Sequence, residues 1–209
     1  MIYRAYIKRF LDIVLALVGL IVLGIPMVFI AVIVRLDSPG PIFFWQKRIG
    51  IHKTCFMMPK FRSMRVDTPH DTPTHLLMNP EHWITPVGRI LRKTSLDELP
   101  QIFCILTGQM SVIGPRPALW NQEDLLSERD KYGANDIRPG LTGWAQINGR
   151  DILSIEDKAQ YDGEYVKKMS FVFDCRCFFG TIGKVLRRDG VVEGSVGELR
   201  KQKEELPQK

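Results

Sequence analysis

The chain has few of the residues that build disulfide-rich or zinc-bound proteins. Its 209 residues include only four cysteines and four histidines. Cys175 and Cys177 are too close in sequence to indicate a disulfide scaffold, so we expect the thiols to be reduced and to face the cytosol. The histidines show no zinc-ligand spacing. The low number of cysteines and histidines argues against a fold stabilised by disulfide bonds and against a structural zinc site.

Several familiar enzyme motifs are also missing. The sequence contains no internal repeat and no Walker A, Rossmann or nucleophile-elbow pattern. Its length suits one domain of ordinary size, with enough chain to bury a core. Any catalytic chemistry must therefore come from a different set of residues.

Charge is absent from one long stretch near the N-terminus. Residues 13–34 form a run of 22 residues without a charged side chain. A helix of that length can enter a hydrocarbon core about 30 Å thick. The run is longer than the apolar region of a signal peptide, about 7–15 residues, and no small-residue cleavage site follows it. The sequence thus predicts a membrane-inserted segment.

The path of this segment through the bilayer has two interpretations. Pro26, near its middle, predicts a bend because proline removes a helical hydrogen bond and clashes with the preceding turn. The segment has basic residues on both sides, Arg4, Lys8 and Arg9 before it and Arg35, Lys47 and Arg48 after it. The positive-inside rule would keep both sides cytoplasmic, which favours a re-entrant helix; a single kinked spanning helix is the alternative. Asp12 needs a partner, for which we expect Lys8 or Arg9, or solvation at the headgroups.

Lys and Arg outnumber Asp and Glu by 29 to 23, which suggests anionic partners such as phosphorylated ligands, acidic lipids or nucleic acid. Lys60 and Arg62 belong to a basic cluster that could bind phosphates or face headgroups. Arg116 lies between two prolines that fix an extended backbone, an arrangement suited to a bidentate phosphate clamp. Arg138 and Arg150 bracket a glycine-rich loop that could approach a ligand or lie solvated at the surface.

Asp97 and Glu98 are adjacent acids between capping residues and an apolar run, a pattern that predicts the start of a helix. Ser95 and Glu98 fit a capping box, whereas Pro100 in the first turn would favour Asp97 as the cap. In either case the helix N-terminus should keep both carboxylates ionised, as a nucleophile or metal ligand requires. The alternative to a catalytic or metal-binding role is that these acids only cap the helix.

The remaining pattern predicts a small α/β-type domain, mostly helical with short strands. Residues 42–45 and 54–58 suggest a hairpin around a basic turn at 46–50, and four prolines make 67–86 a long loop. A short basic helix or turn is expected at 87–93, and helices are expected at 99–106, 118–132, 156–168 and 171–188. The last helix mixes aromatic and basic residues, which suits either a membrane interface or an ordinary core-facing role. We divide the chain into a re-entrant membrane helix with its basic flank (1–36), a catalytic domain (37–190) and a polar, flexible tail (191–209).

Five motifs in a fixed order resemble those of the bacterial sugar transferase family, whose members are monotopic phosphoglycosyl transferases. The resemblance covers residues 1 to 190, and the length matches the minimal single-domain members. The motifs are Lys8-Arg9-x-x-Asp12 before the apolar run, Lys60 to Met64, Ser95 to Gln101, Met110 to Pro117, and Arg138 to Arg150.

This resemblance implies an enzyme of the bacterial inner (cytoplasmic) membrane with its catalytic domain on the cytoplasmic face. It would move a sugar 1-phosphate from a UDP-sugar to undecaprenyl phosphate, release UMP, and so initiate assembly of a surface polysaccharide or glycoconjugate. Membrane lipid and downstream glycosyltransferases are the further partners expected, and nucleic acid is not. The resemblance also favours the re-entrant helix and additional interfacial amphipathic helices.

The same resemblance implies roles for individual residues. Asp97 would be the nucleophile that forms a covalent phosphosugar intermediate, and Glu98 would assist as a base or metal ligand. The family needs Mg²⁺, for which Asp97 and Glu98 are the candidate ligands. The candidate phosphate-binding residues are Arg92, Arg116 and Arg150, and the further candidate site residues are Lys60, Arg62, Arg138 and Asp174. Two positions, Cys104 and Gln109, depart from the family pattern.

The competing hypothesis for the function is a non-enzymatic adaptor that binds anionic lipid or nucleic acid.

Overall fold

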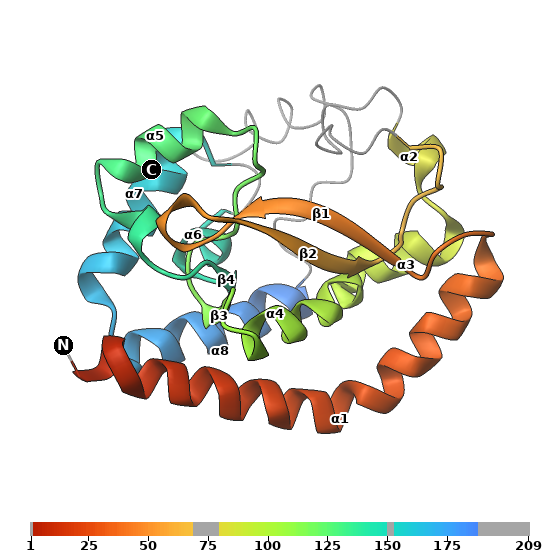
Figure 1. Ribbon diagram of the computed structural model, residues 1–209, viewed down its shortest axis with the longest axis horizontal. Coiled ribbons are helices and arrows are strands. Elements are labelled where there is room, and N and C mark those ends of the chain that lie inside the picture. The colour runs from red at the N-terminus through yellow and green to blue at the C-terminus, as the bar shows by residue number, and fades with distance from the viewer. Residues whose placement is uncertain (1, 69–79, 150–152, 188–209) are drawn as a thin grey trace.

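The computed structural model describes residues 2–68, 80–149 and 153–187. Helices predominate, as predicted, and the strands are short (Figure 1). The longer helices are α1 (Lys8–Asp37), α3 (Pro86–Thr94), α5 (Glu123–Asp130), α7 (Ile155–Lys168) and α8 (Phe171–Arg187). The short helical elements are η1 (Tyr3–Ile7), η2 (Ile51–Lys53), α2 (Pro80–Trp83), η4 (Leu96–Gln101), α4 (Ile102–Leu106), η5 (Ala134–Asp136) and α6 (Trp144–Ile147). The strands are β1 (Phe43–Ile49), β2 (Cys55–Phe61), β3 (Ser111–Ile113) and β4 (Gly140–Thr142).

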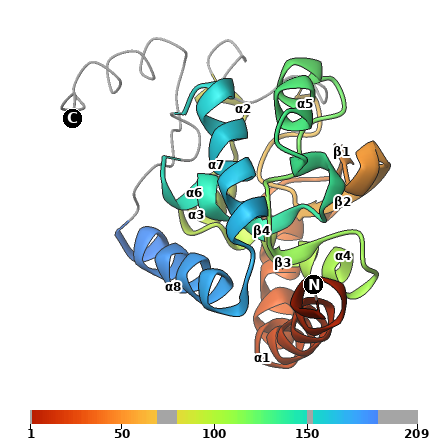
Figure 2. The same cartoon turned by 90° about the vertical axis from the view of Figure 1, so that its left-hand side faces the viewer.

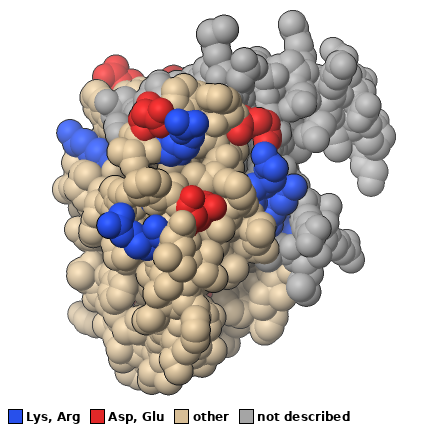
Figure 3. Space-filling view, turned by 90° about the vertical axis from the view of Figure 1, so that its right-hand side faces the viewer, with Lys and Arg blue, Asp and Glu red and all other residues tan. Residues whose placement is uncertain are grey.

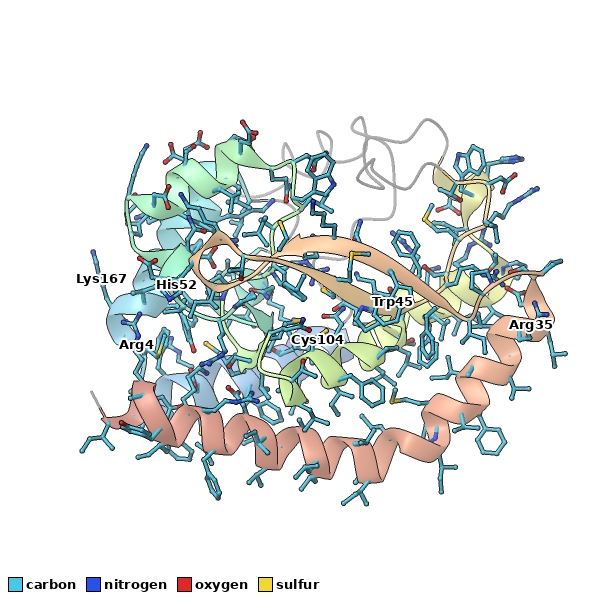
Figure 4. The ribbon with its side chains drawn as sticks, viewed as in Figure 1. Arg4, Arg35, Trp45, His52, Cys104 and Lys167 are labelled. Atoms are coloured by element: carbon cyan, nitrogen blue, oxygen red, sulfur yellow. The ribbon has the colours of Figure 1, made fainter. Side chains whose placement is uncertain are left out.

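Helix α1 runs along one side of the molecule and changes direction part way along its length (Figure 1). Pro26 lies inside this helix, and a proline there removes a backbone hydrogen bond and bends the chain. The continuous stretch Tyr3–Asp37 is long and apolar enough to cross a membrane, judged by length and composition. Arg4 and Arg35 lie near its two ends (Figure 4). The bent apolar helix predicted from the sequence is therefore present.

The first half of α1 is attached to the domain by polar contacts. The Arg9 guanidinium donates to the carbonyl oxygens of Ile105 (2.6 Å) and Leu106 (2.9 Å) at the end of α4. The Asp12 carboxylate accepts from Ser111 Oγ and from the Val112 N–H, each at 2.9 Å. These hydrogen-bond partners differ from the predicted Lys8 or Arg9, because packing brings β3 against the helix and supplies donors from far along the chain.

The second half of α1 is attached as well. Met27 and Val34 pack with the buried side chains of Phe61 and Leu91. The Arg62 guanidinium donates to the carbonyls of Ser38 (2.5 Å) and Pro39 (2.9 Å), just after the helix ends. Both halves of the bent helix are thus fixed to the same domain.

The uncharged surface of the molecule lies on the side of α1. In the view of Figure 3, charged side chains occupy the upper part of the described surface and the lower part shows none. Helix α8 lies at this level too (Figure 2). It buries Phe173 and Cys177 in the core, as the core-facing alternative predicts, and it exposes Phe171, Val172 and Phe179. That these exposed side chains lie at a membrane interface stays a prediction.

Strands β1 and β2 form the predicted hairpin, paired antiparallel from Phe43↔Phe61 to Ile49↔Cys55. The turn is shifted from the predicted position at 46–50, because residues 46–49 continue β1. The chain reverses instead at η2, where His52 and Lys53 have positive φ angles of 52° and 58°. The hairpin crosses over η4 and α4 (Figure 1).

Three other segments also differ from prediction. The helix expected at 118–132 is limited to α5, and the glycine-rich segment contains β4, paired parallel with β3, followed by α6. The predicted loop 67–86 contains α2 and the first residue of α3. Its residues 69–79, like the tail at 191–209, lie outside the described ranges.

The acidic pair follows a sharp junction between two helices. Ser95 has a φ of 57° and ends α3 in a left-handed conformation before η4 begins. An N-cap requires an extended backbone, and the Ser95 side chain makes no capping hydrogen bond. The predicted capping box is therefore absent, although both acids do lie in the first turn of a helix, here a 3-10 helix.

We expect the two hydroxyl residues that flank α3 to respond differently to truncation. Thr85 Oγ1 accepts from the Gly88 N–H at 2.9 Å and caps α3, so Thr85→Ala should lower the free energy of unfolding by about 1 kcal/mol. Ser95→Ala removes no cap and should cost less than about 0.5 kcal/mol. Thermal unfolding of the detergent-purified variants measures both changes, and an equal loss in the two variants would contradict the assignment.

Candidate active site

Asp97 and Glu98 lie in η4, between α3 and α4 and against β2. Both are buried, with 6% and 8% of their surface exposed. Carboxylates are rarely buried unless they are paired with cations or take part in function. The partners of each acid therefore decide what the pair can do.

Glu98 is held by two cations. Its Oε1 accepts from Lys60 Nζ at 3.0 Å and from Arg116 Nη2 at 2.8 Å. Lys60 comes from β2, and Arg116 comes from the loop that follows β3. Three segments that are distant in sequence thus meet at one carboxylate oxygen.

None of the described residues donates a hydrogen bond to the Asp97 carboxylate. Burial raises the pKa of Asp97 above the ordinary value, and repulsion from Glu98 adds to this shift, while the charges of Lys60, Arg92 and Arg116 oppose it. The helix N-terminus alone predicted an easily ionised carboxylate, but desolvation outweighs that effect. Asp97 is accordingly a desolvated carboxyl that cations surround without binding it directly.

The cations of the cluster are also affected by burial. Burial lowers the pKa of Lys60, and the nearby Arg116 charge acts in the same direction, while Glu98 opposes both. Arg92, in the last turn of α3, has a buried Nε without a hydrogen-bond partner among the described residues. This guanidinium retains donors that an anionic ligand could use. The arrangement can bind phosphate groups beside an available carboxylate.

The structure brings together Asp97, Glu98, Lys60, Arg92 and Arg116 of the sequence-predicted residues. It places three of the others elsewhere. Arg62 binds the end of α1, Arg138 Nε donates to the Gly108 carbonyl at 2.9 Å, and Asp174 pairs with Lys8 at 2.7 Å. Arg150 lies outside the described residues.

The contacts of Asp174 tie α8 to the membrane helix. Its carboxylate accepts from the hydroxyls of Tyr3 (2.6 Å) and Tyr165 (2.7 Å) as well as from Lys8. Lys8, Arg9 and Asp12 of the first motif all make contacts of this anchoring kind. The contacts of these three residues attach α1 to the rest of the domain.

Two arginines that the sequence analysis did not assign to the site support the loop of Arg116. Arg48 Nη1 donates to the Pro117 carbonyl and Arg129 Nη2 to the Arg116 carbonyl, each at 2.9 Å. Neither residue lies in a motif or beside another site residue in the sequence. Only the fold brings these side chains to the loop, so no local signal could have identified them.

Within the described part of the chain, neither departure from the family pattern makes a hydrogen bond or ion pair with the two acids. Cys104 is buried on α4 beneath the hairpin, with Sγ 4.0 Å from the Met57 carbonyl oxygen (Figure 4). Burial raises the pKa of Cys104 to about 11, so it is a neutral thiol near pH 7. Gln109 is exposed and contacts Thr107. Both substitutions affect local packing or the surface.

The donor set is compatible with magnesium. The described residues hold no group of three or more His, Cys, Asp or Glu side chains that could hold a metal ion. Mg²⁺ is usually held by one or two carboxylates together with substrate phosphates and water. Asp97 and Glu98 provide two carboxylates next to cations suited to phosphates, which fits that mode of binding.

Comparisons with known proteins found a matching family and several relatives. A family model described as "Bacterial sugar transferase" matches residues 3–188. "Uncharacterized sugar transferase EpsL" of Bacillus subtilis (strain 168) is 38% identical over 185 residues, which cover 88% of this chain and 90% of that protein.

Two relatives carry more informative names. The "UDP-glucose:undecaprenyl-phosphate glucose-1-phosphate transferase" of Xanthomonas campestris pv. campestris is 39% identical over 193 residues, which cover 88% of this chain and 40% of that protein. The "UDP-N-acetylgalactosamine-undecaprenyl-phosphate N-acetylgalactosaminephosphotransferase" of Aeromonas hydrophila is 34% identical over 190 residues, 87% of this chain and 44% of that protein. This chain therefore spans less than half of these two longer relatives.

The two acids should have opposite effects on stability. A carboxyl whose pKa is raised by folding binds its proton more tightly in the folded chain, so its contribution to stability falls as the pH rises from the ordinary carboxyl pKa through the raised one. Asp97→Asn should therefore raise the unfolding temperature at pH 7, and this gain should shrink as the pH falls into the ordinary carboxyl range.

Glu98→Gln should instead lower the free energy of unfolding at pH 7, by about 3 kcal/mol, because it leaves the buried Lys60 ammonium without its anion. Scanning calorimetry of both variants between about pH 3 and about pH 8, which includes the ordinary carboxyl pKa of about 4 and the pH range above it, measures these effects. Loss of stability in Asp97→Asn at neutral pH would contradict the assigned electrostatics.

Proposed function

We propose that this chain, which belongs to the bacterial sugar transferase family, transfers a sugar 1-phosphate from a UDP-sugar to undecaprenyl phosphate and releases UMP. The names of two longer relatives support the donor, acceptor and reaction. The observation that carries the proposal is the unequal pairing of the two acids. Glu98 is bound by Lys60 and Arg116, whereas the neighbouring Asp97 is left available among cations.

In the first step, a carboxylate oxygen of Asp97 attacks the β-phosphorus of the UDP-sugar. The bond from this phosphorus to the oxygen that bridges the two phosphates breaks, and UMP leaves with that oxygen and the electron pair. Asp97 then carries the phosphosugar through an acyl phosphate bond. Arg92 and Arg116 are placed to bind phosphate oxygens and offset the charge that develops.

In the second step, a phosphate oxygen of undecaprenyl phosphate attacks the phosphorus of this intermediate. The bond to Asp97 breaks, the free carboxylate returns, and the sugar remains attached to undecaprenyl diphosphate. Glu98 holds Lys60 and Arg116 in place through both steps. Because burial raises the pKa of Asp97, its activity as a nucleophile should be lost on acidification at a higher pH than for an exposed aspartate.

Magnesium would be held by Asp97 and Glu98 together with the substrate phosphates, and it would neutralise phosphate charge. The protein contributes the dry, cationic surroundings in which these groups meet. The sugar remains open, since the relatives are named for different sugars, including glucose and N-acetylgalactosamine.

The membrane helix is proposed to be re-entrant. A helix that crosses the bilayer carries its two ends to opposite sides, yet both halves of α1 are fixed to the same domain. The bend and the uncharged surface around α1 suit insertion into one leaflet. The active site would then face the cytoplasm at the inner membrane, where a soluble UDP-sugar can meet a lipid acceptor.

We expect detergent-purified enzyme to release UMP from at least one member of a UDP-sugar panel, with full turnover requiring undecaprenyl phosphate and Mg²⁺. Asp97→Asn should lower this rate by roughly a thousandfold or more, because the neighbouring Glu98 is bound to Lys60 and Arg116 and is not placed to act as the nucleophile. Glu123→Gln, which removes an exposed acid in the first turn of α5, is the matched control and should keep wild-type activity. The proposal fails if no sugar yields UMP or if Asp97→Asn retains the wild-type rate.

The re-entrant path makes a separate prediction. Single cysteines introduced at Arg4 and Arg35 in a cysteine-free background should both react with a membrane-impermeant maleimide in inside-out vesicles. Both should be protected in right-side-out vesicles, because the two ends of the helix lie on the cytoplasmic side. Labelling of the two positions from opposite sides would establish a spanning helix instead.

A further inference from the structure

We infer that Arg129 and Asp162 form a buried positioning pair that sets the location of the Arg116 guanidinium. The inference rests on the proposed function, because Arg116 is one of its phosphate-binding residues. Neither member of the pair contacts Asp97 or Glu98 in the described structure. They act on the reaction through the main chain of Arg116.

The contacts form a continuous path from α7 to the acidic pair. Arg129, on α5, binds Asp162 Oδ2 on α7 through Nε at 2.8 Å and through Nη2 at 2.7 Å. The same Nη2 donates to the Arg116 carbonyl at 2.9 Å. The Arg116 side chain reaches Glu98 Oε1 at 2.8 Å. A single guanidinium thus joins the α5–α7 layer to the residue that holds Glu98.

The loop needs anchoring through its carbonyl groups. Arg116 is flanked by Pro115 and Pro117, and neither proline has an N–H to donate. The three carbonyls of this tripeptide accept from Gly140 N–H (2.8 Å), from Arg129 and from Arg48 (2.9 Å). Of these three contacts, the one from Arg129 falls on the residue whose side chain enters the site. Its loss would free the main chain at the point where position matters most.

The pair is built for rigidity. Arg129 and Asp162 are 5% and 1% exposed, and an ion pair this deeply buried is weak evidence for a stabilising role alone. The planar guanidinium can bind the carboxylate and the carbonyl at once, which the single ammonium of lysine cannot reproduce in the same geometry. Asp162 Oδ1 has no hydrogen-bond partner among the described residues, so the hydrogen bonds of this carboxylate go to Arg129 through Oδ2.

A double-mutant cycle separates positioning from simple stability. The contact of Arg129 is with the main chain of Arg116, so it persists in Arg116→Ala, where no guanidinium remains to be positioned. We expect Arg129→Lys to lower kcat/KM for UMP release about 10-fold or more in the chain that contains Arg116. In the Arg116→Ala background the same change should alter kcat/KM less than about 2-fold. The dissociation constant of UDP, measured by calorimetry, should likewise rise on Arg129→Lys in the chain with Arg116 and change little in the Arg116→Ala background. This measurement can also be made on variants whose turnover is too slow to assay.

Two further variants keep the test decisive. Asn135→Ala is the matched control, since Asn135 binds the Leu126 carbonyl (2.8 Å) and Asp130 (2.7 Å) at the same helix without contacting Arg116. It should lower the unfolding temperature and leave kcat/KM within about 2-fold of wild type. Asp162→Asn, which keeps the side-chain shape, replaces Arg129→Lys if the latter does not fold.

Equal losses of kcat/KM and of UDP affinity in both Arg116 backgrounds would overturn the positioning role and leave the proposed function standing. A wild-type protein that releases no UMP from any UDP-sugar would overturn the proposed function and this role with it. Coupled losses confined to the chain with Arg116 would establish the role.

Discussion

The carboxylate of Glu98, shared between Lys60 and Arg116, is the contact on which the candidate active site depends. It joins the hairpin, η4 and the loop after β3 at one oxygen atom. Because both cations bind Glu98, they attract Asp97 without hydrogen-bonding to it. Asp97 therefore remains available at a buried position among cations. A desolvated carboxylate is more reactive there, but it also lowers the stability of the folded chain.

The membrane helix and the site form one structural unit. Arg9 binds the carbonyls at the end of α4, and α4 directly continues η4. At the other end of α1, Arg62 binds the chain just beyond the helix and follows directly on β2, the strand that carries Lys60. The acids are consequently held at a defined position relative to the uncharged surface. In the proposed reaction, such fixed placement would bring the phosphate of the lipid acceptor and the Asp97 carboxylate together.

The sequence predicted elements better than it predicted partners. The hairpin, the helices around 87–93 and 156–168, and the bent apolar helix follow from local patterns that packing did not override. The capping box at Ser95 failed because the junction between α3 and η4 requires a left-handed backbone there. Asp12 accepts its hydrogen bonds from Ser111 and Val112, whereas the expected Lys8 acts on it through its charge alone, because folding brings β3 against the helix.

The sequence by itself determined that an apolar helix enters a membrane, that two adjacent acids begin a helix, and that basic residues accompany them, because composition, charge and spacing are local properties. Only the tertiary structure decided which cations serve the acids and which serve as anchors. Lys60 reaches Glu98 whereas Arg62, two residues on, binds the end of α1. Arg129 supports Arg116 through a carbonyl. Such pairings depend on the distances that folding sets between segments remote in sequence, and no local pattern encodes them.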